Sequence, residues 1–168
     1  MYAKLMIRIR TKLLLLVVAL AMTSCGFKLK GGYEIPYQTV YIQADVDSRV
    51  GRELKKKIER KYKNMLVDAA SSAEVVVSVL AENSTRSISV LSNSGAVDEY
   101  ELLYSIQFRI YSPQNATNAL DSQLSLRRKI TYSDQNISAK SSEEALLIND
   151  MADEAATRIL VRLSKDRI

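Results

Sequence analysis

The residue types that most often carry out chemistry in proteins are scarce in this chain. Its 168 residues include one cysteine, Cys25, and no histidine. The chain therefore lacks the commonest general base near neutral pH and the commonest zinc ligand, and it cannot form an intramolecular disulfide. Paired carboxylates such as Glu99 and Glu101 have the spacing of a solvated strand face. We predict a protein that is not an enzyme and that holds no metal and no cofactor.

Cys25 stands directly after a segment with the features of an export signal. Four basic residues and no acid occur in the first twelve positions, and the apolar run 13–21 follows. That run is shorter than the roughly 20 apolar residues that a transmembrane helix needs. We therefore interpret residues 1–24 as a signal peptide.

The stretch MTSC at 22–25 resembles the lipobox of bacterial lipoproteins, in which the cysteine receives diacylglycerol and becomes the mature N-terminus. The resemblance implies lipid attachment, including palmitate, at Cys25, and several acyl chains would hold the protein firmly to a membrane. Gly26 takes the place of the aspartate that commonly retains lipoproteins at the inner membrane, which points to the outer membrane. The alternative is cleavage after Ala21, which would leave Cys25 as a free thiol.

Positive charge is concentrated in one short segment. The chain has 24 Lys and Arg residues against 19 Asp and Glu, and four of those cations lie in the signal, so residues 25–168 carry a net charge of +1. Residues 49–63 contain eight basic and two acidic residues. The candidate contacts for an anionic surface are Arg52, Lys55, Lys56, Arg60 and Lys63. That surface is phosphorylated lipid or the acidic wall of a partner; a merely solvated helix face is the alternative, and export argues against nucleic acid.

A second basic group, Arg127 to Lys129, lies in a strand-like segment. The two-residue period of a strand places Arg127 and Lys129 on one face, with Arg128 on the core side or at an edge. Charges in such positions protect a sheet edge against pairing with another chain, or they contact a ligand. The sequence supports both interpretations.

Strands are predicted where β-branched and aromatic residues recur with a period of two. The predicted strands are 39–44, 73–91, 99–110 and 124–132, and the alternation is clearest in 99–110. We interpret the polar stretch 112–122 between the last two as a connection.

Two helices are predicted from caps and apolar stripes. The first begins at a cap formed by Asp45 or Asp47 and runs to about Met65, and the second opens with Ser141 and Glu144, spaced as a capping box. The stripes of the two helices are Val50, Leu54, Ile58, Tyr62 and Met65, and Ile148, Ala152, Ala155, Ile159 and Leu163.

These elements predict an α+β fold with the order β-α-β-β-β-α. A single sheet of about four mostly antiparallel strands, with both helices packed on one face, buries every stripe. Residues 25–38 contain two adjacent glycines and a proline, and we interpret them as a lipidated tether. Residues 39–168 then form a single domain.

Three stretches of the sequence resemble the LptE family of lipopolysaccharide-assembly lipoproteins. They are CGFKLKG at 25–31, NSGAVDEYELLYSIQFRIY at 93–111, and the segment 132–163, which begins YSDQNISAK and continues into the last helix. Their order and spacing match the family over nearly all of the chain after the signal.

The resemblance implies an outer-membrane lipoprotein that plugs and helps assemble the β-barrel protein LptD and binds lipopolysaccharide. Lys140 occupies the position of the family's Ala-Lys, which has been linked to that ligand; Arg86, Arg127 and Lys129 are further candidates, because lipopolysaccharide carries phosphates. The hairpin tip at 91–93 lacks the basic residue that some members have. The alternatives are a stand-alone periplasmic lipid-binding lipoprotein and a lipoprotein activator of a peptidoglycan enzyme.

Overall fold

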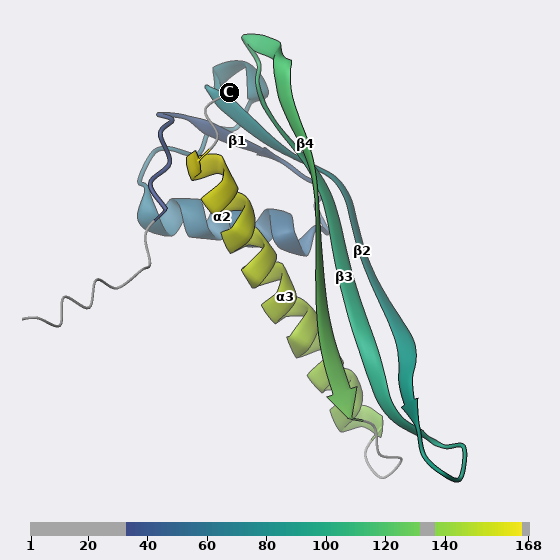
Figure 1. The fold of residues 1–168 in the computed structure, drawn as a ribbon. Coiled ribbons are helices and arrows are strands. Elements are labelled where there is room, and N and C mark those ends of the chain that lie inside the picture. The colour runs from purple at the N-terminus through teal and green to yellow at the C-terminus, as the bar shows by residue number, and fades with distance from the viewer. Residues whose placement is uncertain (1–32, 132–136, 166–168) are drawn as a thin grey trace, which may run out of the picture. The chain divides into compact units, whose positions relative to one another are not determined.

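The computed structural model describes residues 33–131 and 137–165, and its fold has the predicted α+β class. The described elements follow the order β1 (Val40–Gln43), α2 (Arg49–Lys61), a 3-10 turn (Ala70–Ser72), β2 (Val75–Leu91), β3 (Val97–Ser112), β4 (Asn115–Thr131) and α3 (Ile137–Lys165). The strands form one sheet in the order β1-β2-β3-β4 (Figure 1). β1 pairs with β2 in parallel, and the other pairs are antiparallel, which confirms the predicted mostly antiparallel sheet.

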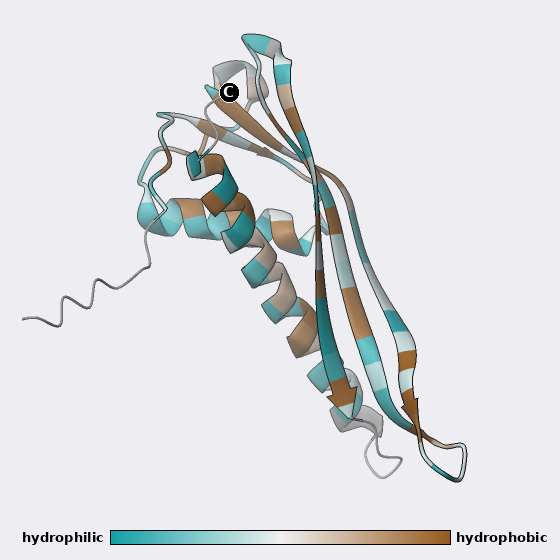
Figure 2. Cartoon of the chain, in the orientation of Figure 1, coloured by the Kyte–Doolittle hydropathy of each residue, from teal (hydrophilic) through white to brown (hydrophobic). Residues whose placement is uncertain are grey.

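Strict alternation along β3 decides which face of the sheet is covered. The side chains that alternate into the core are Leu102, Tyr104, Ile106, Phe108 and Ile110, all at most 3 % exposed. Figure 2 shows the same alternation of apolar and polar residues along the long strands. The residues between them lie on the opposite, open face, which polar side chains dominate. Both helices pack against the apolar face and contribute to one core, as the stripes predict.

Helix α2 is shorter at both ends than the sequence predicts. Ser48, and not Asp45 or Asp47, is the N-cap, because its hydroxyl accepts a hydrogen bond of 2.9 Å from the backbone N–H of Gly51. The helix ends at Lys61 rather than near Met65. The reason is that the chain turns away at once, so that the Met65 carbonyl can accept from the Val40 N–H beside β1.

Helix α3 begins at Ile137, four residues before the predicted start, so the capping box of Ser141 and Glu144 is wrong. Ser141 lies inside the helix, and the Glu144 carboxylate accepts a hydrogen bond from Arg86 on β2. The helix packs through a buried stripe that belongs to the common core of both helices and the sheet. Its fully or almost fully buried residues are Met151, Ala152, Ala155, Ala156, Ile159, Leu160 and Leu163.

Strand β4 is longer than its sequence indicates, and the predicted polar connection 112–122 is wrong. Residues 115–122 already pair with β3, with Asp121 opposite Arg109 and Leu120 opposite Ile110. Pairing is a backbone interaction, so an edge strand whose side chains meet water keeps its ladder without an apolar pattern. Arg128 lies within this continuous strand, although its charge breaks the apolar alternation of Leu124, Leu126 and Ile130.

Residues 33–38, which the sequence predicts to be part of the tether, lie against the domain, with Ile35 and Tyr37 each only 7 % exposed. The signal segment, Cys25 and the motif at 132–134 lie outside the described residues. Within the part that is described, no helix is long and apolar enough to cross a membrane.

Candidate functional site

The four cations proposed from the sequence as ligand contacts gather at one end of the sheet but on two faces. In the strand register Arg86 lies opposite Leu102, Arg127 opposite Leu103 and Lys129 opposite Glu101. These three basic residues therefore cross the sheet at nearly the same level.

Arg86 and Lys140 lie on the side of the sheet that α3 covers. The Arg86 guanidinium is 2.8 Å from the Glu144 carboxylate and 4.7 Å from the centre of the Tyr100 ring. Lys140, in the first turn of α3, forms an ion pair of 2.9 Å with Glu143. Both cations thus pair with carboxylates in the N-terminal part of α3, on adjacent residues that point in different directions from the helix.

Arg127 and Lys129 lie on the open face, and Arg128 lies on the helix-covered face, where it is paired with Glu154 of α3. This division confirms the predicted alternation of the three basic residues. Arg127 is 3.8 Å from Glu101, and Lys129 is 2.8 Å from Glu99. Their side chains keep 68 % and 63 % of their surface exposed, so both cations are accessible to a ligand.

Each of these four cations has a carboxylate partner on the protein surface. The hydrogen bonds from Lys129 and then from Ser89 lower the pKa of Glu99 below its ordinary value, and the Glu99 carboxylate raises the pKa of Lys129. Exposed ion pairs of this kind contribute little to stability, because water screens them. A phosphate group could therefore take the place of the carboxylate at small cost.

We predict that Lys129→Met raises the pKa of Glu99 toward its ordinary value of 4.5, because the largest cause of the lowering is removed. The shift is incomplete, since the Ser89 hydroxyl still donates at 2.9 Å. Carbon-detected NMR titration of the Glu99 carboxyl measures it. The Lys129–Glu99 pair therefore stabilises the folded protein at pH values above the ordinary pKa of Glu99. This contribution is lost as the pH falls through the lowered pKa. Lys55→Met is the control, and an unchanged Glu99 pKa in Lys129→Met contradicts the prediction.

The basic residues of α2 form a separate surface away from this end. We call the exposed residues Arg52, Lys55, Lys56 and Arg60 of α2, together with Lys63 just past its end, the basic face. It lies opposite the buried side of the helix, which carries Val50, Leu54 and Ile58. Lys57, between the two sides, forms an ion pair of 2.6 Å with Asp153 of α3.

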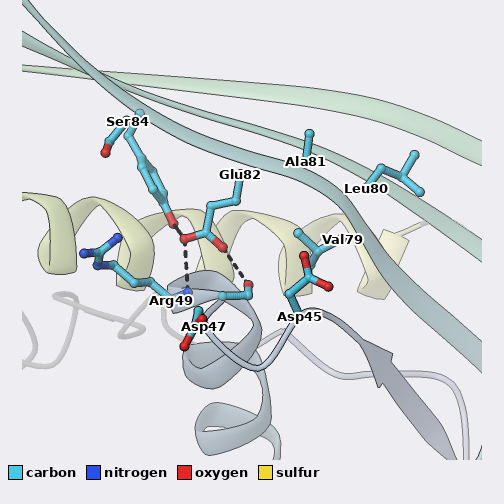
Figure 3. Close-up of a pocket in the computed structure, with 10 residues that line it drawn as sticks. Asp45, Asp47, Arg49, Val79, Leu80, Ala81, Glu82 and Ser84 are labelled. Atoms are coloured by element: carbon cyan, nitrogen blue, oxygen red, sulfur yellow. Dashed lines mark hydrogen bonds between the residues drawn. The ribbon is translucent and has the colours of Figure 1, made fainter.

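A cavity of about 210 Å³ lies where β2 passes the start of α2, and it is not among the sites predicted from the sequence. Figure 3 shows Glu82 at its centre, with hydrogen bonds drawn to the start of the helix. The Glu82 carboxylate accepts from the Ser48 hydroxyl at 2.6 Å, the Arg49 N–H at 3.0 Å and the Tyr104 hydroxyl at 2.5 Å. One acidic residue thus ties β2, β3 and α2 together.

The chemistry around Glu82 is structural. Burial, and then the hydrogen bond to Glu82, raise the pKa of Tyr104 far above its ordinary value, so the phenol keeps its proton and remains a donor. A carboxylate with three donors also supplies the N-terminal hydrogen-bond partners of a helix. No local sequence signal marks this contact, because the alternation of Val75, Val77 and Val79 would place residue 82 on the opposite face. Only the register shift between Val79 and Ala81 brings Glu82 opposite the buried Ile106.

Several solved structures that are similar to this chain are those of bacterial lipoproteins. The solution structure of uncharacterized lipoprotein B from Nitrosomonas europaea has 32 % sequence identity and a TM-score of 0.69, and the match covers 83 % of this chain and 90 % of that one. Rare lipoprotein B from Shewanella oneidensis has 27 % identity and a TM-score of 0.64, with 75 % and 93 % covered. A minor lipoprotein from Acinetobacter baumannii, at 19 % identity and a TM-score of 0.61 over 78 % and 93 %, shows the fold alone.

These similarities place the domain in a class of bacterial lipoproteins. In this chain the helices cover one face of the sheet and leave the other open. Residues 37–163 match the model of one family, LptE, described as lipopolysaccharide-assembly. The chain therefore belongs to the LptE family. A search among curated proteins found no match.

Proposed function

We propose that this protein is the lipid-anchored partner of the LptD barrel: it is attached through Cys25 to the outer membrane, plugs the barrel lumen, helps the barrel assemble and binds lipopolysaccharide. It acts by binding and filling space rather than by catalysis. Membership of the LptE family over residues 37–163 is the observation that carries the proposal.

The open face of the sheet supports a position inside a barrel. Its side chains include Asn83, Thr85 and Ser87 on β2 and Ser105 and Gln107 on β3. The interior of an outer-membrane barrel is polar and wet, so a plug needs an outward surface that forms hydrogen bonds and ion pairs. The buried alanines of α3 support a closely packed domain rather than a carrier with a lipid cleft.

The cations at the end of the sheet support binding of a phosphorylated lipid. Arg86 and Lys140 offer positive charge on one side of the sheet, and Arg127 and Lys129 offer it on the other. Each is paired with a carboxylate on the surface, so phosphate oxygens can compete for the same donors.

The experiment for the partner is extraction from membranes followed by in-cell photocrosslinking from Gln107. We expect a stable one-to-one complex with a large barrel and adducts of that barrel. Recovery of the acylated protein as a free monomer, without adducts, would contradict the plug.

The experiment for the ligand is lipopolysaccharide binding by a variant with four residues changed to glutamine, namely Arg86, Arg127, Lys129 and Lys140. We expect at least about a tenfold loss of affinity, measured as the ratio of the two dissociation constants. Arg109→Gln is the matched control, because Arg109 lies on the same open face and is also paired across strands, with Asp121 at 2.5 Å. Equal losses in the two variants would contradict a specific role for this end of the sheet.

A further inference from the structure

The chain leading into the domain is fixed to the C-terminal end of the basic helix. The Tyr33 carbonyl accepts hydrogen bonds from the Tyr62 hydroxyl at 2.9 Å and from the Lys61 ammonium group. Lys61 also lies 4.3 Å from the centre of the Tyr33 ring. The Ile35 N–H donates to the Tyr62 hydroxyl at 3.2 Å, and the Ile35 side chain is buried. Tyr33 therefore cannot move away from α2 without breaking these contacts.

The basic face of α2 has few partners of its own. Lys56 is 3.3 Å from Glu53 in the same helix, whereas Lys55, Arg60 and Lys63 form no ion pair within residues 33–131 and 137–165. Glu59 is the one exposed acidic residue of α2. The face thus presents a concentrated positive charge on a chain whose net charge after the signal is close to zero.

We propose that the basic face lies on the anionic phospholipid headgroups of the membrane that holds the lipid on Cys25. The inference rests on the lipid attachment in the proposed function and adds an orientation to it. Eight peptide steps join Cys25 to Tyr33, and each spans at most about 3.6 Å. Tyr33, which contacts the end of α2, therefore stays within about 29 Å of the anchor. The connecting segment itself carries Lys28 and Lys30.

Charge and connectivity together favour lipid over an acidic protein wall. Basic residues are attracted to an anionic bilayer when they lie within about a Debye length of it, and the anchor keeps α2 at high local concentration beside that surface. The four cations at the end of the sheet take no part in this membrane contact. They remain available to the phosphates of lipopolysaccharide, as in the proposed function. The anchor and the basic face form a two-point attachment, as stable membrane binding generally requires.

The test uses the full, acylated protein inserted into vesicles, with a fluorophore on Glu59→Cys in the basic face and lipids that carry a quencher on the headgroup. Cys25 is blocked by its lipid, so only the new thiol reacts. We expect at least about twofold stronger quenching with phosphatidylglycerol present than in phosphatidylcholine alone. The difference disappears at about 1 M salt, where the Debye length falls to about 3 Å. A fluorophore on Gln114→Cys, at the β3–β4 hairpin, remains unquenched.

The matched variants separate the basic face from total charge. In the labelled protein, Lys55→Gln, Arg60→Gln and Lys63→Gln together should abolish the phosphatidylglycerol-dependent quenching. Arg109→Gln, Arg158→Gln and Arg162→Gln, which remove the same charge elsewhere, should leave it intact. Equal effects of the two sets overturn the proposal.

Three further outcomes separate a failure of the proposed orientation from a failure of the proposed function. Absent quenching on an acylated, vesicle-bound chain overturns this orientation alone, and photocrosslinks from α2 to an acidic protein would then identify the occupant. An N-terminal peptide whose mass shows no acyl chains overturns both the orientation and the lipid anchor of the proposed function. Failure of the barrel complex with quenching intact overturns only the plug.

Discussion

Replacing Glu82 with alanine is expected to lower the free energy of unfolding by about 3 kcal/mol, since a buried donor left without an acceptor costs about 1–3 kcal/mol. The Ser48 hydroxyl and the Tyr104 hydroxyl both donate to this carboxylate, at 2.6 Å and 2.5 Å. Tyr104 has no exposed surface, although its hydroxyl lines the cavity that holds Glu82. Urea unfolding of the wild type and the variant measures the difference.

Two control variants separate the hydrogen bonds of Glu82 from its charge. Glu82→Gln keeps an acceptor oxygen and should cost only about 1 kcal/mol. Glu59→Ala removes an exposed carboxylate from α2 and should change stability by less than about 0.5 kcal/mol. If Glu82→Ala behaves like Glu59→Ala, the three-way contact does not hold β2 to α2.

Leu54→Ala is expected to destabilise the protein by about 3 kcal/mol, within the range of about 2–5 kcal/mol for removing a large buried aliphatic side chain. Leu54 has no exposed surface and lies in the middle of the buried side of α2. The loss combines apolar burial with the cavity that remains between α2 and the rest of the core. Thermal and urea unfolding give the value.

Leu146→Ala is the matched control, because the same atoms are removed from a helical leucine that is 65 % exposed. We expect a change of less than about 0.5 kcal/mol. Similar losses at Leu54 and Leu146 would contradict the packing of α2 through its apolar stripe. The comparison of Leu54 and Leu146 also bears on the proposed membrane contact, because the basic face keeps its orientation only while α2 stays packed on the core.

The stability of α2 links the two regions of the molecule that bear on function. Its start is held by Glu82 of β2, and its end holds Tyr33 of the incoming chain. Two acidic residues on other elements, Glu82 and Asp153, thus contact a helix that is otherwise strongly basic. Loss of either end contact would loosen the connection between Tyr33 and the sheet.

The amino-acid sequence by itself determined the class of fold and its element order. The alternation in β3 and the stripe Val50, Leu54 and Ile58 are periodic patterns, and a period reports directly which side of an element is buried. The placement of Arg127 and Lys129 on one face follows from the same two-residue period. The type of each element and its buried side can therefore be predicted without knowing which distant residues the element contacts.

Only the tertiary structure decided the ends of the elements and the partners of the charges. Ser48 caps α2 while its hydroxyl donates to Glu82, 34 residues away, and α3 begins at Ile137 while its Glu144 is bonded to Arg86, 58 residues away. The start of β4 at Asn115 rests on backbone pairing with β3. Caps, edge pairing and ion pairs are contacts between residues far apart in the chain, so no local period records them; they form only once the sheet and helices have packed.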